Sequence, residues 1–399
     1  MITAVDLSGY DKLIDKIAKD LHSGKMKPSD LNQELISQTY EDLAKGAKAG
    51  YGKDWAKFPA DGKGSTPTEL KKNIYAFSGA KCYAQLEKIN SYLYDKDGKL
   101  RPFNEFAVFA RKENRQYNVN YLQAEYQTAR TAAQMAEKWE RLQETKDLFP
   151  NLEYRTVGDD RVRRDHQRLD GIIKPMDDPF WDRHYPPLDW RCRCDVRATA
   201  ADATDDKDVI LPPVKFKGNV GKDKEIFTNK GTFFRLISGD GNAKRNQELA
   251  KFNAPFEDLK TEKGKTVKIS VYADRKAPQF DGDLEVATVL ADVGVRTSLL
   301  AHVNIDKEVH PTLSVSGKPA DRITPKGLGF KNDLSKANEQ RRAVLVVDLK
   351  DNDNTMQEVV DQLRIELKDE TTYPEIKEVV IVSADRKEVK QFSRKDFNE

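Results

Sequence analysis

Hydrophobic residues recur at helical spacing through the first third of the chain. A first apolar stripe is formed by Leu13, Ile14, Ile17, Ala18 and Leu21. Residues 28–47 (PSDLNQELISQTYEDLAKGA) predict a second helix, with Pro28 and acidic residues at its start. In residues 65–90, Thr66 can cap a helix, Pro67 suits its first position, and Glu69 completes a capping box.

A longer amphipathic pattern runs from about residue 104 to residue 144. Its apolar stripe consists of Leu122, Tyr126, Ala129, Ala132, Ala133, Ala136 and Trp139. Such a stripe is typical of a packed helix face. Residues 1–150 are therefore predicted to form a helical arm.

The middle of the chain changes in character. Residues 151–197 hold prolines, aromatic residues and short apolar runs, which predict a small loop-rich module extending to about residue 235. A polar hinge is expected at 198–208 (ATAADATDDKD), and the hydrophilic residues 236–265 are expected to be a linker.

Residues 266–399 alternate between strand and helix patterns. TVKISVY (266–272) alternates like a half-buried strand, whereas AVLVVDL (343–349) and EVVIVS (378–383) are apolar throughout, as in buried strands. LEVATVLADVG (284–294) and TMQEVVDQLRIEL (355–367) are helical patterns. The whole chain is thus predicted to be an α+β multidomain protein, with a helical N-terminal region, a loop-rich Cys/His module and a C-terminal α/β domain around a central mixed sheet.

Composition narrows the class of protein. Charged residues make up 34% of the 399 residues, yet the net charge is only +2, so wholesale electrostatic binding to nucleic acid is not indicated. No apolar run reaches membrane-spanning length, and residues 1–21 resemble an amphipathic helix and not a signal peptide. Three cysteines do not make a disulfide framework, so a soluble protein of a reducing compartment, without a membrane partner, is expected.

Four metal-ligand types lie close together in the central module: His166, His184, Cys192 and Cys194. Two His and two Cys are an accepted tetrahedral zinc set, although a C-x-C pair is a rarer chelate than C-x-x-C. The alternative is that the cysteines pack a small core with nearby aromatic residues while both histidines make ordinary hydrogen bonds. Zinc is therefore a candidate cofactor of the module, with its absence the alternative.

The module is also rich in arginine. RVRRDHQR supplies Arg161, Arg163 and Arg164, but the module as a whole has as many acidic as basic residues. That balance favours salt-bridged packing or a protein interface over a broad phosphate groove. These three arginines, with Trp181 and Trp190, are candidate interface residues, and nucleic-acid contact is the alternative.

At these residues the chain resembles the phage Mu F-type minor head proteins, also called head morphogenesis proteins. The matching motifs are R-T-x-x-D-x-R-V-R (155–163), H-x-x-L-x-G (166–171), D-x-P-F-W (177–181), Tyr-Pro-Pro (185–187) and W-x-C-R-C-x-V (190–196). The resemblance covers about residues 10–235. It implies a low-copy structural protein of a phage or prophage head, found in the virion after assembly in the bacterial host cytoplasm. Its implied partners are the portal, other head proteins and packaged DNA.

Residues 266–399 resemble, less closely, the barnase/EndoU/colicin/RelE-like nucleases carried at the ends of phage head proteins and toxins. That resemblance implies a virion-delivered toxin as the alternative function, with tRNA or other RNA as substrate and an immunity protein as partner. Metal-independent RNA cleavage needs a base, an acid and cations. The candidates are His302, His310, Arg322, Thr324, Lys326 and Lys331. Thr312 and Ile323 stand where related domains carry an acid and a lysine, which disfavours a metal route and leaves open a domain that only binds.

Overall fold

A computed structural model of the chain describes residues 8–205, 216, 218–228, 233–305 and 309–397. The chain divides into two compact units. The first unit is Met1–Lys57 with Thr66–Ala250, and the second is Phe58–Ser65 with Lys251–Glu399. The helical arm and the central module therefore belong to one unit, and the predicted division into four parts stays a prediction.

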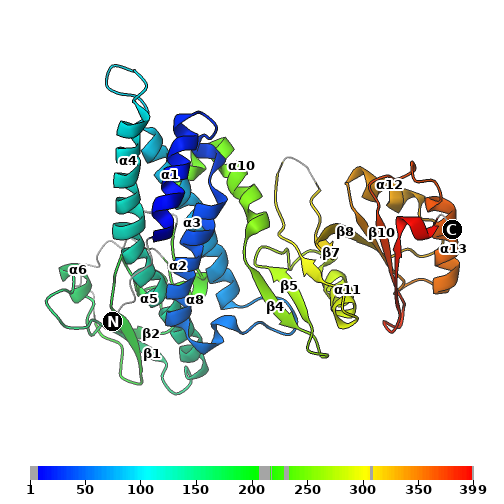
Figure 1. The fold of residues 1–399 in the computed structure, drawn as a ribbon. Coiled ribbons are helices and arrows are strands. Elements are labelled where there is room, and N and C mark those ends of the chain that lie inside the picture. Colours follow the sequence, from blue (N-terminus) through cyan, green and yellow to red (C-terminus); the bar gives the residue numbers. More distant parts are fainter. Residues whose placement is uncertain (1–7, 206–215, 217, 229–232, 306–308, 398–399) are drawn as a thin grey trace. The chain divides into compact units, whose positions relative to one another are not determined.

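Long helices make up most of the first unit (Figure 1). They are α1 (Ser8–His22), α2 (Gln33–Tyr51), α3 (Thr66–Asn90), α4 (Phe103–Arg115) and α5 (Leu122–Glu144), with short turns η1 (Pro28–Asp30), η2 (Lys53–Ala56) and η3 (Gln116–Tyr121). The helical pattern predicted over 104–144 is confirmed, with one difference: η3 is π-helical and joins α4 to α5. Residues of the predicted stripe, such as Ala129, Ala132 and Ala136, are fully buried.

Helices α2 and α5 pack at unusually close range. A Cβ atom added at Gly50 would lie 1.9 Å from the backbone oxygen of Arg130, and one at Gly46 would lie 2.8 Å from that of Tyr126. Only glycine permits backbones to approach this closely. Helix α5 is also joined to α3 by a buried ion pair between Lys81 and Glu125, whose side chains are 1% and 3% exposed.

The central module is built on a small antiparallel sheet. Its elements are β1 (Asn151–Arg155), α6 (Arg164–Gln167), β2 (Ile173–Pro175), α7 (Trp181–His184) and β3 (Asp195–Thr199). Within the described residues the sheet has three strands in the order β2-β1-β3, and Leu152 pairs with Lys174 on one side and Ala198 on the other. The Tyr185 hydroxyl donates a hydrogen bond of 2.9 Å to the carbonyl of Met135, which ties the module to α5.

The hydrophilic segment 236–265, predicted to be a linker, contains regular secondary structure. It contains part of α9 (Phe234–Ser238), then α10 (Gly241–Ala250), η4 (Lys251–Asn253) and β4 (Phe256–Lys260); α8 (Val220–Asp223) precedes them. The polar side chains of α10 make specific bonds, because Asn246 donates to the Ser29 carbonyl and Gln247 to the Ala76 carbonyl, both at 2.8 Å. Part of the predicted hinge at 198–208 lies outside the described residues.

The second unit contains a mixed sheet of eight strands within the described residues. Its order is β11-β10-β9-β8-β7-β6-β5-β4, with β8, β9 and β10 parallel to one another and β5 parallel to β6. The strands after β4 are β5 (Thr266–Ser270), β6 (Thr297–Leu299), β7 (Leu313–Val315), β8 (Lys318–Ile323), β9 (Val344–Asp348), β10 (Glu378–Val382) and β11 (Val389–Ser393). The predicted α/β character of this region is confirmed.

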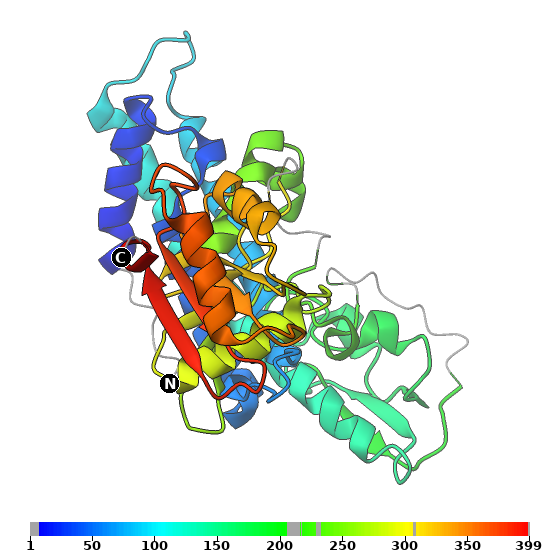
Figure 2. The same ribbon diagram turned by 90° about the vertical axis from the view of Figure 1, so that its right-hand side faces the viewer.

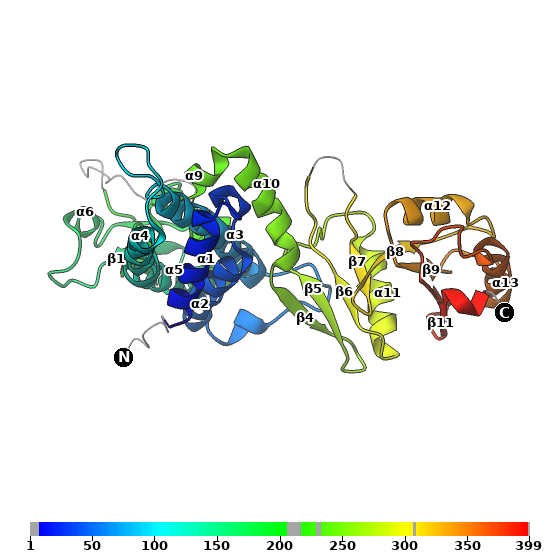
Figure 3. The same cartoon turned by 45° about the horizontal axis from the view of Figure 1, so that its top comes forward.

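Helices cover both faces of this sheet (Figure 2, Figure 3). They are α11 (Phe280–Asp292), α12 (Lys331–Glu339) and α13 (Met356–Leu367), followed at the C-terminal end by η5 (Arg394–Phe397). Val344 and Val346 face the core shared with α11, whereas Leu345 and Val347 face the core shared with α12 and α13. Burial on both faces explains why β9 is apolar without alternation.

Among the helices that the structure describes, none is both long and apolar enough to cross a membrane.

Candidate functional site

Three of the four predicted metal ligands come together in the central module. The Nδ1 atom of His166 lies 3.6 Å from Sγ of Cys192 and 3.6 Å from Sγ of Cys194. The three ligand atoms all lie within 4.8 Å of one another, and the three residues are 7%, 3% and 5% exposed. We call these three residues the Cys/His cluster. Helix α6 positions His166, and the segment leading into β3 positions both cysteines.

The spacing of the Cys/His cluster fits a zinc ion. Zinc bonds of about 2.0–2.1 Å to nitrogen and about 2.3 Å to sulfur, at tetrahedral angles, place the two ligand atoms about 3.6 Å apart. Hydrogen bonding from Cys194, and then from His166, lowers the pKa of Cys192 to about 4, whereas the hydrogen bond to Cys192 and burial raise the pKa of Cys194. A thiolate is the form of cysteine that binds metal. The residues could therefore hold a metal ion through three protein ligands.

His184 lies apart from the cluster. Its ring stacks on Phe180 with the ring centroids 4.8 Å apart, at the end of α7. It is not a member of the metal-ligating group found in the described part of the chain. From the sequence, both histidines were predicted to bind the metal because both are close to the cysteines along the chain. In the structure His166 belongs to α6 and His184 ends α7, with β2 between these two helices.

The two tryptophans predicted at an interface differ in burial, because Trp181 lies inside the first unit and Trp190 is partly exposed. Trp181 is completely buried and donates from Nε1 to the Pro175 carbonyl at 3.0 Å. Trp190 packs edge-on against Phe216 with centroids 4.9 Å apart. These rings stabilise the module, whereas Arg161, Arg163 and Arg164 are exposed and remain candidate interface residues.

A cavity of about 830 Å³ opens beside the Cys/His cluster. Cys192 and Cys194 contribute to its lining, and so do polar residues of α5, including Gln127, Thr131 and Gln134. Its remaining charged lining residues are Arg130, Arg161, Arg163, Arg191, Arg193 and Asp195. We call this the arginine cavity. Arg130 was not recognised from the sequence, because it belongs to a helix whose stripe indicates only packing.

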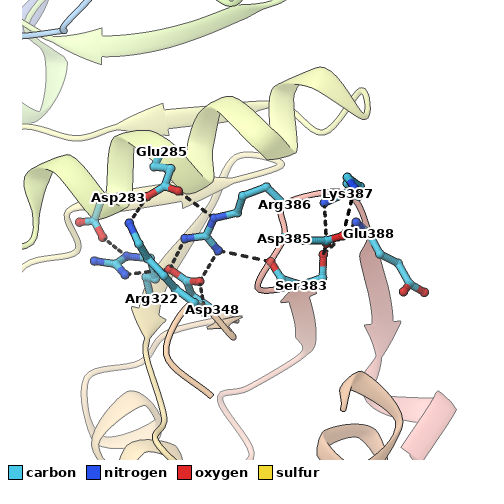
Figure 4. Close-up of polar contacts among 10 residues, drawn as sticks. Asp283, Glu285, Arg322, Asp348, Ser383, Asp385, Arg386, Lys387 and Glu388 are labelled. Atoms are coloured by element: carbon cyan, nitrogen blue, oxygen red, sulfur yellow. Dashed lines mark hydrogen bonds and ion pairs between the residues drawn. The ribbon is translucent and has the colours of Figure 1, made fainter. Parts of the chain in front are cut away.

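The second unit contains a separate network of buried charges (Figure 4). Asp348, fully buried at the end of β9, accepts hydrogen bonds from Arg322 at 3.0 Å and from Arg386. Arg322 also donates to Asp283 on α11 at 2.7 Å. Glu285, on the same helix, accepts from Arg386 at 2.9 Å and from Lys350 at 2.8 Å. These contacts lie at the carboxyl ends of the parallel strands, where α/β sheets commonly bind ligands.

The surroundings shift the pKa values of two acids of this network in opposite directions. Burial raises the pKa of Asp283, although Arg322 acts against that change. The hydrogen bonds from Arg386 and Lys350 lower the pKa of Glu285 to about 2. The part that Asp283, Asp348 and Arg386 play in this network was not predicted from the sequence. An acid directly after the apolar run of β9 was the available signal for Asp348.

The six predicted catalytic residues are spread over the second unit. Arg322 lies in the charge network, and the exposed Thr324 and Lys326 follow it in the turn after β8. His302 is exposed, with its amide bonded to the Tyr272 carbonyl at 2.9 Å. His310 packs its ring against Phe252 with centroids 5.1 Å apart, and Lys331 is exposed at the start of α12. Neither histidine is among the described contacts of Arg322.

The region that contains the Cys/His cluster is similar to a known protein family. Residues 84–197 match the family model described as phage Mu protein F like protein, so the chain contains a Mu F-like domain. The match ends within β3 and includes the whole Cys/His cluster.

Two curated relatives agree with the family model. The putative capsid assembly protein F of Escherichia phage Mu is 44% identical over 66 residues, which is 16% of this chain and 15% of that protein. The Mu-like prophage FluMu F protein of Haemophilus influenzae is 44% identical over 73 residues, 18% of this chain and 16% of that protein. The chain thus matches only about a sixth of the length of these relatives.

A solved CdiA-CT/CdiI toxin and immunity complex from Burkholderia pseudomallei is also similar. The alignment covers 29% of this chain and 84% of that chain, with 14% identity and a TM-score of 0.24. A score this low does not establish a shared fold.

Proposed function

We propose that the chain is a minor head protein of a phage or prophage, associated with the portal and acting in head morphogenesis and in DNA packaging or delivery. The observation that carries this proposal is the Mu F-like match over residues 84–197. The matched region includes α4, α5 and the module packed on α5, so it corresponds to one folded part of the first unit. The curated relatives are a capsid assembly protein and a prophage F protein, which supports the same function.

The proposed partners follow from that role. They are the portal, other head proteins and packaged DNA, and the proposed location is the virion head after assembly in the host cytoplasm. The exposed arginines Arg161, Arg163 and Arg164 are proposed contact residues, because exposed guanidinium groups suit polar interfaces.

We further infer that the Cys/His cluster holds zinc and that the ion stabilises the module. The support is the match between the observed separations of 3.6 Å and those of a tetrahedral site. The sheet of the module has three short strands within the described residues, so it buries only a small core. A bound ion would add to the stability of the folded module. The ion would fix α6 against the segment that precedes β3.

The portal contact can be tested by co-purification. Tagged full-length protein, co-expressed with the portal protein of the same phage genome, should retain the portal on the affinity resin. Arg164→Glu should reduce the retained portal at least several-fold, because it reverses the charge of a proposed contact residue. Arg164 is exposed and lies outside the arginine cavity, so this variant leaves the cavity unchanged. Arg183→Glu, an equal charge change at an exposed position of α7, is the control and should retain it. No retention of portal by the unaltered protein would contradict the proposal.

A second candidate function is that of a virion-delivered toxin with a metal-independent RNase in the second unit. The observation in its favour is the charge network at the carboxyl edge of β8 and β9, with the exposed Thr324 and Lys326 beside it. RNA, including tRNA, would be the substrate, and an immunity protein would be the partner. Purified full-length protein should then shorten tRNA in the presence of EDTA, and Lys326→Ala should slow cleavage at least tenfold. Intact tRNA would reject this function and leave the structural role unaffected.

A further inference from the structure

The arginine cavity collects guanidinium groups from three separate parts of the first unit. Arg130 lies on α5, Arg161 and Arg163 precede α6, and Arg191 and Arg193 flank Cys192. These residues are up to 63 positions apart in sequence. The backbone of Arg191 is held in a left-handed conformation (φ 57°), and its amide donates to the Thr128 hydroxyl of α5 at 3.1 Å. The fold therefore fixes the cationic segment against the helix.

Neighbouring acids neutralise only part of this positive charge. The carboxylate of Asp159 accepts hydrogen bonds from two of the five arginines: two of 2.7 Å from Arg193 and one of 3.1 Å from Arg161. Asp189 lies 3.7 Å from Arg163. Asp195 of the cavity wall is already bonded to Lys138 at 2.7 Å.

Two arginines have no acid of their own. Among the residues that the structure describes, no ion pair is made by Arg130 or Arg191. Both side chains are exposed and line the cavity. Holding like charges together without a counter-charge is unfavourable, so the cavity is suited to an anionic ligand.

The lining indicates the chemical class of that anion. Guanidinium groups present forked donors that match phosphate oxygens in pairs. The amides of Gln127 and Gln134 and the hydroxyl of Thr131 can add uncharged hydrogen bonds. None of the described lining residues is aromatic, so the cavity offers no surface on which bases could stack.

We propose that the arginine cavity binds the phosphate groups of a nucleic-acid backbone, without reading base sequence. This site rests on the proposed function, in which packaged DNA is a partner, and deepens it by naming the residues that would contact the DNA; loss of DNA binding and loss of portal contact are measured separately. From the sequence, nucleic-acid contact at Arg161 and Arg163 was only the alternative to a protein interface, because the module is near neutral in composition. The fold gathers arginines around one cavity and adds Arg130 from α5. Contacts to phosphate alone give affinity that is independent of sequence and falls with salt.

Fluorescence anisotropy with the full-length protein tests this site. The probes are labelled DNA oligonucleotides of two unrelated sequences, each as a single strand and as a duplex, titrated at several salt concentrations. Arg130→Gln/Arg191→Gln should weaken binding about tenfold or more and reduce the slope of log K against log salt by about 1–2. Both substitutions are at exposed positions, so circular dichroism should show an unchanged fold.

A charge-matched control and two competitors make the result specific. Arg168→Gln/Arg183→Gln removes the same charge at exposed positions outside the cavity and should leave affinity within about twofold. Unlabelled DNA should displace the probe at lower concentration than inorganic phosphate or polyglutamate. Equal loss in both double variants, or no loss in the cavity variant, would overturn the proposal. Displacement by polyglutamate at lower concentration than by DNA would overturn it in favour of an acidic protein partner.

Discussion

The Nδ1 atom of His166 lies 3.6 Å from Sγ of Cys192, although the two residues are 26 positions apart. The antiparallel pairing of β1 with β3 explains this proximity, because it returns the chain beside the segment that leads into α6. The cluster is thus a tertiary feature of the module and depends on the sheet being formed. Metal binding by the cluster and the stability of the folded module are therefore expected to be coupled.

Metal content is the first prediction. Full-length protein purified without chelator should contain about one zinc per chain, and Cys192→Ser should remove it, because serine is a poor zinc ligand. Elemental analysis by mass spectrometry measures the stoichiometry. Cys82→Ser is the matched control: Cys82 is also a free, buried cysteine, but it lies on α3, and this variant should keep its zinc. Metal-free wild-type protein, or equal loss in both variants, would refute the zinc site.

His184→Ala separates the sequence-based ligand set from the structural one. The ring of His184 stacks on Phe180 and is not part of the group of ligand atoms that lie within 4.8 Å of one another, so this variant should retain the same zinc stoichiometry as wild type. His166→Ala should lose it. Loss of zinc in His184→Ala with an unchanged circular dichroism spectrum would instead add His184 to the three ligands of the cluster, as the sequence predicted.

The close approach of α2 and α5 predicts a strong effect of a single methyl group. Gly50→Ala should destabilise the first unit by about 1–3 kcal/mol or more, because the new Cβ atom would meet the Arg130 backbone oxygen. Urea unfolding followed by circular dichroism measures the change. Gly241→Ala is the control: nothing lies within 4 Å of its added Cβ atom, so it should cost almost nothing. Equal stability of Gly50→Ala and wild type would be inconsistent with this helix contact.

The buried ion pair of Lys81 and Glu125 gives a further test. Lys81→Met should destabilise the first unit by about 3–5 kcal/mol, because it leaves a buried carboxylate without its partner. Lys81→Met/Glu125→Leu should recover much of that loss, since neither charge is then buried. Arg141→Gln, which breaks a surface pair between the exposed Arg141 and the partly exposed Glu137, should cost less than about 1 kcal/mol. A double variant no more stable than the single variant would contradict this explanation.

The second unit should show a defined response to acid at Glu285. Arg386 and Lys350 lower the pKa of this carboxyl from 4.5 to about 2, so its stabilising effect is present above pH 4.5 and is lost as pH falls toward 2. Wild type should therefore be more stable than Glu285→Gln at neutral pH, and the difference should narrow between about pH 5 and pH 2. Thermal unfolding across that range measures it. A difference that stays constant with pH would show that the ion pairs do not set it.

The elements of both units could largely be predicted from hydrophobic periodicity. The stripe on α5 and the apolar strands β9 and β10 have strong patterns, because each buries a face or both faces against neighbours. Helix α10 and strand β4 were missed, since α10 is held through Asn246 and Gln247 and β4 buries Glu257 beside Arg275. Polar side chains that bond to specific partners leave no periodic signal.

The candidate sites were predicted in part. His166, Cys192 and Cys194 were found because rare ligand types lie close together in the sequence, and His184 was added for the same reason although its helix places it elsewhere. Arg130 and Asp348 were not assigned a role from the sequence, although the acid that ends the apolar run of β9 was a signal for Asp348. Each contributes through contacts with segments distant in the chain, which only the fold brings together.

The central proposal is that this chain is a component of a phage head, and counting the protein in purified particles tests it most directly. Quantitative mass spectrometry of particles from a phage or prophage that encodes the chain should find it at a few copies per particle, comparable to the portal and far below the major capsid protein. Infectious particles that contain none of it would contradict the account.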